Sequence, residues 1–289
     1  MTMRIDAHHH VWDLAVRDQP WMTGDLMAPI ARSFGIDEFM AEAEAHGIGA
    51  SVVVQTVTEV AETGELLDLC AATQRVAGVV GWVDLAAADV GDQLDRLEAR
   101  PSGEWLVGIR SLVQYEPDAD WLGRPAVVAG LREVSRRGLV NELLVLPHQL
   151  PAVLGAAHEV PEGKFVLDHL AKPAIAASQW DPWASDLAAV ARCSNVVAKV
   201  SGLVTEAVWS RWTPADIRPY LDHAISVFGP DRIVFGSDWP VCTLAASYTQ
   251  VVELIEHGIG ELSADERAAI FGGNAIATYT LNPSLLEAS

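Results

Sequence analysis

The 289-residue sequence predicts an α/β fold, a single TIM barrel, or (β/α)8 barrel, over residues 1–289 with an added C-terminal helix. Short runs of Val, Ile and Leu alternate with helical patterns eight times along the chain. These runs are apolar on both faces, as expected for a parallel sheet that is covered on both sides. No linker-like composition divides the chain, and no GxGxxG pattern follows the first strand, which disfavours an open doubly wound sheet.

The apolar runs place the strands at Met3–Val11, Ser51–Gln55, Val79–Asp84, Leu106–Arg110, Glu142–Leu146, Lys164–His169, Asn195–Ser201 and Asp231–Asp238. The helical patterns between them lie at Ile36–Ala45, Glu62–Arg75, Val90–Arg100, Pro125–Arg137, a segment through Val153, Trp183–Ala191, Pro214–Phe228 and Tyr248–His257. Gly47 and Pro101 are stop signals after the first and third helices. Ser263 and Glu266 form a capping box that starts a last helix, Ala264–Tyr279.

The composition argues against several classes of protein. No apolar run approaches the ~20 residues of a membrane span, and the N-terminus has no signal-peptide pattern. A formal charge of −20 repels phosphate backbones and anionic lipid, so neither nucleic acid nor a membrane is expected as a partner. The three cysteines show no CxxC spacing, which favours reduced thiols in a cytoplasm. A homodimer is left open.

Three consecutive histidines, His8, His9 and His10, end the first predicted strand. Side chains alternate along a strand, so His8 and His10 point to one side and His9 to the other. Inside a barrel, two imidazoles one pleat apart suit a first-row metal ion or a polarised water. Two hydrogen-bonded core histidines are the structural alternative.

Polar residues also interrupt the apolar runs at or just past the C-terminal ends of the other predicted strands. Because barrel active sites lie at this face, we expect these residues to form a site. Together with His8 and His10, the set is Gln55, Asp84, Arg110, His148, His169, Lys199, Ser201 and Asp238. Lys199 is equally compatible with a buried ion pair.

Five segments carry a family resemblance: Ile5–Asp13 (IDAHHHVWD), Gly108–Arg110 (GIR), Leu167–Pro173 (LDHLAKP), Lys199–Leu203 (KVSGL) and Phe235–Pro240 (FGSDWP). Together they resemble the amidohydrolase superfamily and its amidohydrolase-2 branch. Within that branch they match the sugar-lactonase group, which includes fuconolactonase-like and rhamnonolactonase-like enzymes. The resemblance extends from residue 5 to about residue 274 and implies the same barrel.

The resemblance implies four candidate metal ligands, His8, His10, His169 and Asp238. Two-metal members of the superfamily carry a carbamylated lysine or a glutamate at the end of the fourth strand. Arg110 stands there in this chain, so a bridged pair of metals is not expected. The lactonase group has members with one divalent ion and members with none. One ion is therefore expected, with zinc favoured over manganese, and a metal-independent reaction stays open.

The chemistry of these side chains suggests a hydrolytic mechanism. Asp238 would act as general base toward water and return the proton to the departing ring oxygen. A bound metal would polarise the lactone carbonyl; without one, His169 and Arg110 would stabilise the developing oxyanion. The planar guanidinium of Arg110 also suits a carboxylate or carbonyl oxygen. The structural alternatives are a loop-bracing Asp238 and an Arg110 paired with Asp84 or another barrel acid.

The residues expected to bind substrate are Arg110, His148, Lys172, Trp12 and Ser201. Trp12 is one of several tryptophans in predicted loops, where indole rings can stack on sugar C–H faces or simply anchor the loop. His148 follows Pro147 by one residue, so its register leaves open a ligand-facing or a helix N-terminal position. Lys172 lies in the loop after the sixth strand and faces either substrate or solvent.

These features together favour hydrolysis of a sugar-derived lactone, such as an L-fucono- or L-rhamnono-type lactone, to its acid. A metal-dependent decarboxylase of the same branch and a non-catalytic barrel that binds a small ligand are the alternatives. A covalent serine mechanism is disfavoured because Ser201 and Ser237 lack the GxSxG pattern. Cys242 has no obvious activating partner in the sequence.

Overall fold

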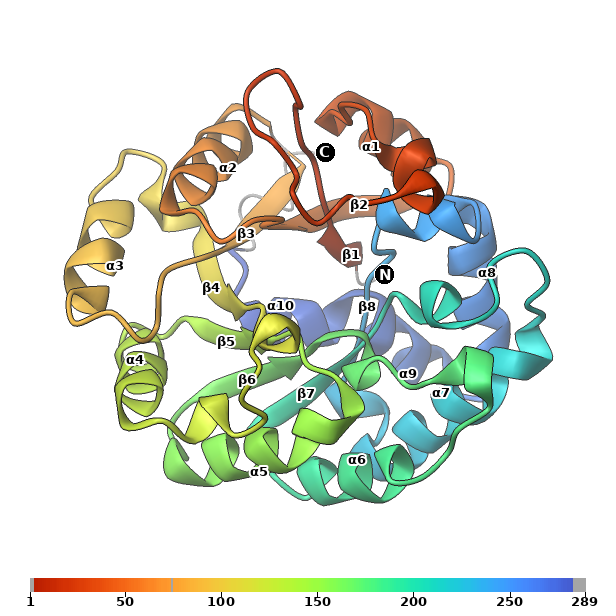
Figure 1. Cartoon of the computed structure of the whole chain (residues 1–289). Helices are drawn as coiled ribbons and strands as arrows, with labels where there is room; N and C mark the ends of the chain where they lie inside the picture. The colour runs from red at the N-terminus through yellow and green to blue at the C-terminus, as the bar shows by residue number, and fades with distance from the viewer. Residues whose placement is uncertain (1–2, 74, 283–289) are drawn as a thin grey trace.

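The structure is a computed structural model that describes residues 3–73 and 75–282, and it confirms the predicted (β/α)8 barrel (Figure 1). The strands are β1 (Arg4–His9), β2 (Ile48–Val54), β3 (Val76–Gly81), β4 (Leu106–Ser111), β5 (Val140–Leu143), β6 (Lys164–Leu167), β7 (Val196–Val200) and β8 (Ile233–Phe235). They form one sheet in sequential order, and each consecutive pair is parallel.

The first and last strands meet at their carboxyl ends. His9 pairs with Trp239 in a parallel bridge, and the His10 N–H donates to the Trp239 carbonyl at 2.7 Å. The Asp238 N–H donates to the His8 carbonyl at 2.8 Å. Closure of the barrel therefore fixes the backbone of the histidine run against the backbone of Asp238.

Ten α-helices occur among the described residues, and most of them surround the sheet (Figure 1). They are α1 (Ile36–Glu44), α2 (Val60–Ala72), α3 (Val90–Glu98), α4 (Pro125–Arg136), α5 (Leu150–Glu159), α6 (Trp183–Ala191), α7 (Pro214–Phe228), α8 (Tyr248–Gly258), α9 (Ala264–Ala268) and α10 (Asn274–Tyr279). None of the helices in the described part of the chain is long and apolar enough to cross a membrane.

Two hydrophobic layers hold the barrel together. The outer layer lies between the strands and the surrounding helices. The inner layer fills the barrel with small and branched side chains such as Ala7, Val52 and Val166, and Ala275 and Tyr279 of α10 join it. Helix α10 therefore closes the barrel floor, opposite the carboxyl ends of the strands (Figure 1).

All eight strands differ from their predicted bounds by up to three residues, and the last helix is not continuous. Strand β3 ends at Gly81 rather than Asp84, β5 ends at Leu143 rather than Leu146, and β8 covers only Ile233–Phe235. The Ser263–Glu266 capping box is confirmed. The helix after it is interrupted by a π-helical turn in which Gly272 lies against the backbone of Met3. A Cβ at Gly272 would lie 2.0 Å from the Met3 carbonyl oxygen, so only glycine fits there.

Candidate active site

A cleft of about 230 Å³ opens at the carboxyl ends of the strands. His10, Arg110, His169 and Asp238 line it, and four different strands or strand ends supply them. The structure thus brings together four of the residues predicted from the strand ends. Their convergence at this face is the arrangement that parallel barrels use for active sites.

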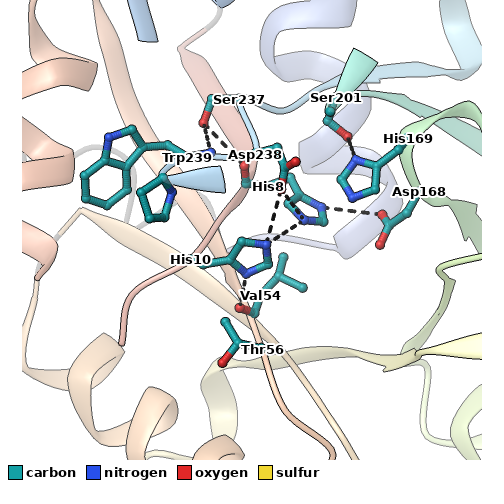
Figure 2. Close-up of polar contacts among 12 residues, drawn as sticks. His8, His10, Val54, Thr56, Asp168, His169, Ser201, Ser237, Asp238 and Trp239 are labelled. Carbon is teal, nitrogen blue, oxygen red and sulfur yellow. Dashed lines mark hydrogen bonds and ion pairs between the residues drawn. The ribbon is translucent and has the colours of Figure 1, made fainter. Parts of the chain in front are cut away.

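His8, His10 and Asp238 form a compact group, two of whose members, His10 and Asp238, line the cleft (Figure 2). The two imidazole Nε2 atoms are 3.2 Å apart. Asp238 Oδ1 lies 3.4 Å from His10 Nε2 and 3.7 Å from His8 Nε2. The His10 Nδ1–H donates to the Val54 carbonyl at 2.7 Å, which fixes this ring and leaves the Nε2 lone pair of a neutral His10 facing the group.

The spacing of these three ligand atoms fits a single divalent ion. Zinc–nitrogen bonds of about 2.0–2.1 Å in a tetrahedral site separate neighbouring ligand atoms by about 3.3 Å. The distances of 3.2, 3.4 and 3.7 Å are close to that value. The hydrogen bond from His10 to Val54 is the kind of outer contact that orients a metal-ligating imidazole. The group could therefore hold a metal ion.

The Asp238 carboxylate is held in its ionised form by its neighbours. Burial would raise the pKa of Asp238, but His169, His10 and His8 together lower that pKa well below the usual value. The backbone of Asp238 has a φ of 59°, a left-handed conformation that non-glycine residues rarely adopt. Strained conformations of this kind persist where surrounding contacts determine them, and they cluster at functional sites.

His169 reaches the cleft from an unusual turn after β6. Its Nδ1 lies 2.8 Å from the Ser201 hydroxyl, and its ring meets His8 edge-on at 4.6 Å between centroids (Figure 2). Burial lowers the pKa of His169 to about 4, so the ring is neutral near pH 7. Gly202 has a φ of 63°, and a Cβ there would lie 2.7 Å from His169 Nδ1. Gly202 is thus required next to this ring.

A buried charged network lies below His8. Lys199 Nζ is 2.7 Å from Glu142 Oε1, 3.0 Å from Asp168 Oδ1 and 3.0 Å from His8 Nδ1. Burial and Asp168 raise the pKa of Glu142 to about 7, against the lowering effect of Lys199. Burial would also raise the pKa of Asp168, but Lys199 and His8 hold it well below its usual value. Lys199 is therefore a buried ion-pair member, one of its two predicted alternatives.

Glu142 and Asp168 were not among the predicted site residues. Glu142 was placed at the start of its strand, where an apolar run gives no sign of a functional group. The Tyr279 hydroxyl donates to Glu142 Oε2 at 2.6 Å, so the network also reaches the C-terminal helix α10. The spacing of residues along one strand cannot reveal the contact between Glu142 and Tyr279, because these residues are far apart in sequence.

Arg110 lines the cleft and also pairs with an internal acid. Its guanidinium lies 3.4 Å from Asp168 Oδ2 and 3.3 Å from His8 Nε2, and it donates to the Gln55 carbonyl. Of the predicted internal partners, Asp84 or another barrel acid, Asp84 is wrong, because β3 ends before Asp84 and leaves it exposed in a loop. The acid that Arg110 meets is Asp168.

The outer part of the cleft is aromatic and polar. Trp21 and Trp209 line it, as do Lys172 and Glu206, whose Nζ and Oε1 atoms are 3.5 Å apart. Lys172 was predicted to face either substrate or solvent, and its side chain lines the cleft. Glu206 and Trp21 were not predicted to bind substrate, because they lie in loops whose path the sequence does not specify. Trp209 is one of the loop tryptophans for which sugar stacking or loop anchoring was left open.

The structure keeps three predicted substrate-binding residues away from the cleft surface. His148 is exposed in a short 3-10 helix, Pro147–Gln149, because β5 ends three residues earlier than predicted. Trp12 is buried, and its Nε1–H donates to the Arg32 carbonyl at 2.6 Å, which makes it a loop anchor. Ser201 is buried behind His169 and touches that ring rather than the cleft.

A larger cleft of about 410 Å³ lies outside the barrel, where Trp12, Phe34 and Leu66 line it. Neither His10 nor Asp238 lines this cleft, and its walls are mostly apolar. The barrel mouth is therefore the better candidate for catalysis, because convergent polar groups distinguish a reactive site from an apolar groove.

Known proteins resemble the chain over nearly its whole length. L-fucono-1,5-lactonases of Burkholderia multivorans and Burkholderia ambifaria are 39% and 36% identical to it. The matches cover 96% and 98% of this chain, and 96% and 97% of those proteins. A crystal structure of an amidohydrolase from Burkholderia multivorans with bound zinc superimposes with a TM-score of 0.89 at 38% identity. That match covers 97% of this chain and 100% of the other.

The sequence profile of the amidohydrolase family matches residues 5–281, from the first residues of β1 to just beyond α10. The matched region contains the histidine run, the strand ends that line the cleft and the helix that closes the barrel floor. Together with the barrel and the His8, His10 and Asp238 group, this match leads to one conclusion. The chain is a member of the amidohydrolase family.

Proposed function

We propose that the protein hydrolyses a sugar-derived lactone to its open-chain acid, with Asp238 as general base and then general acid. The observation that carries the proposal is the ionised Asp238 carboxylate, held among three imidazoles at a cleft in the barrel mouth. The relatives named L-fucono-1,5-lactonase, at 36–39% identity, support a sugar lactone as the substrate.

In the proposed reaction, Asp238 orients a water molecule and accepts its proton as the water attacks the lactone carbonyl carbon. The carbonyl oxygen becomes an oxyanion, and the bond to the ring oxygen then breaks. Asp238 returns the proton to that oxygen, so the leaving group departs as an alcohol rather than an alkoxide. Water is consumed, and no other reactant is needed.

His169 and Arg110 are the proposed donors to the oxyanion. If the Ser201 hydroxyl donates to His169 Nδ1, the neutral ring carries its proton on Nε2 and can donate it. Ser201 would then act through His169 rather than on substrate. Arg110 supplies positive charge at the cleft, and its contacts to Asp168 and Gln55 hold the guanidinium in place.

We infer that His8, His10 and Asp238 hold one divalent ion, with zinc favoured over manganese. The spacing of their ligand atoms supports this inference, as does the zinc bound by the related amidohydrolase. A bound ion would lower the pKa of a water molecule and polarise the lactone carbonyl. His169 belongs to a second group that could hold an ion, with His8 and Asp168, and we propose that in this reaction it acts as an oxyanion donor.

The charge balance of the cleft favours a neutral substrate over the anionic carboxylic acid that a decarboxylase would bind. Arg110 is close to Asp168, and Lys172 is close to Glu206, so each cation at the cleft already has a carboxylate beside it. An anionic acid would need a cation that is free to pair with it. A sugar lactone carries no charge and requires hydrogen bonds and aromatic surface instead, which Trp21 and Trp209 offer.

The test is a screen of 1,4- and 1,5-aldonolactones with a pH indicator, against protein-free blanks, on protein of measured metal content. Acid release from at least one hydroxylated lactone is expected. A parallel assay for carbon dioxide release from dihydroxybenzoates tests the decarboxylase alternative. No lactone turnover, either as purified or after addition of zinc, manganese or magnesium, would contradict the proposal. Full activity in metal-free protein would contradict only the metal requirement.

A further inference from the structure

We propose that Lys172 and Glu206 form a hydroxyl-recognition pair that makes the cleft prefer polyhydroxylated lactones to bare ones. The inference rests on the proposed lactone hydrolysis and names the residues that read the sugar. Both side chains line the cleft, where they are 25% and 22% exposed. They come from different loops, after β6 and after β7, so the cleft itself is the place where they meet.

The Lys172–Glu206 pair leaves hydrogen-bonding capacity for a ligand. Its Nζ–Oε1 distance of 3.5 Å exceeds the roughly 2.7–2.9 Å of a good charge-assisted hydrogen bond. Among the described residues, neither the ammonium nor the carboxylate has another hydrogen-bond or ion-pair partner. An ammonium has three donors, and a carboxylate accepts through two oxygens. Sugar hydroxyls, which both donate and accept, could use the remaining donors and acceptors.

The backbone holds Lys172 in the cleft by a conformation that L residues disfavour. His169, Leu170, Ala171 and Lys172 have φ values of 50°, 51°, 59° and 51° in succession, a left-handed turn without glycine. The Trp183 Nε1–H donates to the Leu170 carbonyl at 2.7 Å and helps to hold this turn. Because of the turn, His169 and Lys172 both reach the cleft.

The neighbouring tryptophan adds the apolar part of sugar recognition. Glu206 ends the short 3-10 helix Leu203–Glu206, and the Trp209 Nε1–H donates to the Thr205 carbonyl of that helix at 2.8 Å. The Trp209 indole and the Glu206 carboxylate thus both line the cleft from one short segment. An aromatic face that packs on C–H groups, next to groups that bind hydroxyls, is the combination that suits a sugar ring.

The test compares kcat/KM for the best hydroxylated aldonolactone with kcat/KM for δ-valerolactone, a six-membered lactone without hydroxyls. A site that hydrogen-bonds hydroxyls discriminates strongly against an analogue that lacks them. Glu206→Ala and Lys172→Met are each expected to lower the ratio of the two values about tenfold or more, mainly through a higher KM for the hydroxylated lactone. Glu206→Gln should recover part of the ratio, because an amide oxygen still accepts.

The matched control is Glu159→Ala, which removes a surface ion pair of similar length, 3.4 Å to Arg132. Its ratio should equal that of the wild type. Calorimetry with an aldonolactam, whose amide is less reactive than the lactone ester, supplies a second readout, and Glu206→Ala and Lys172→Met should weaken its binding about tenfold. Unchanged ratios, equal losses on both lactones or unchanged lactam affinity would overturn the recognition pair. A wild type that hydrolyses no lactone would instead overturn the proposed function.

Discussion

Lys199 is the cation at the centre of the buried charged network inside the barrel. It lies fully buried between Glu142 and Asp168 and contacts His8. Lys199→Met would leave the buried Glu142 carboxyl without its ion-pair partner and Asp168 with Arg110 alone, and breaking a buried ion pair typically destabilises a protein by about 3–5 kcal/mol. We expect a loss of that size in the free energy of unfolding, measured by urea denaturation.

The chain offers a matched control for this substitution. Lys164 begins β6 with an exposed side chain, so Lys164→Met should change the unfolding free energy by no more than about 0.5 kcal/mol. Equal effects of the two substitutions would mean that the Lys199 ion pairs add nothing to the stability of the barrel.

Glu62 gives a prediction about pH. Its carboxylate accepts hydrogen bonds from the backbone N–H groups of Thr56 and Val57, and burial raises its pKa above the usual value despite those bonds. The folded state therefore binds this proton more tightly than the unfolded state. The contribution of Glu62 to stability is fully present below the unfolded-state pKa and is lost as the pH rises through the folded-state pKa.

Glu62→Gln removes this titration and isolates its effect. We compare the unfolding free energy of the wild type with that of the variant. The wild-type value minus the variant value should be larger at about pH 5 than at about pH 8. Urea denaturation of both proteins at the two values gives the comparison. The reverse order would show that the hydrogen bonds from Thr56 and Val57 outweigh burial.

At the residue scale, sequence reasoning found the side chains that share a strand end. His8 and His10 follow from alternation along one strand, and His169 and Asp238 from their positions after apolar runs. Glu206 could not be found in this way, because its place depends on the fold of a loop. Three of the four family-implied metal ligands, His8, His10 and Asp238, form one metal-sized group, and the fourth, His169, lies in a second such group with His8 and Asp168.

At the scale of elements, the left-handed turn after β6 is the least expected feature. Ala171 is buried in it with a φ of 59°. Glycine adopts positive φ without the Cβ penalty, so Ala171→Gly should cost less stability than Ala→Gly in a right-handed helix. The two losses of unfolding free energy should differ by at least about 1 kcal/mol. Ala156, buried within α5, is the matched position. Equal losses at both sites, measured by denaturation, would contradict a strained turn at Ala171.

The elements themselves were mostly predictable, whereas their ends were less so. Apolar runs gave all eight strands and their order, because a parallel barrel requires a continuous apolar strand in each unit. The ends of β3 and β5 were misplaced by three residues each, because Val83 and Leu146 extend the apolar runs beyond the hydrogen-bonded ladder. These shifts remove Asp84 and His148 from the site.

At the scale of the whole molecule, the site depends on both ends of the chain. β1 and β8 close the barrel beside Asp238, while Tyr279 of α10 contacts Glu142 from the barrel floor. The net charge of −20 exerts no net force on a neutral lactone, and it repels the acid that hydrolysis produces. The acidic surface is thus compatible with the proposed reaction and assists release of its product.

The central claim is that Asp238 is the catalytic base. A comparison of the lactonase activities of Asp238→Asn and Asp84→Asn tests it most directly. Both substitutions replace a carboxylate that was predicted at a strand end, but only Asp238 lies in the cleft, whereas Asp84 is exposed in a loop. With the folded state verified by circular dichroism, Asp238→Asn should lower kcat about 10²–10⁴-fold, and Asp84→Asn should retain wild-type kcat. Wild-type kcat in Asp238→Asn would contradict the assignment of Asp238 as the catalytic base.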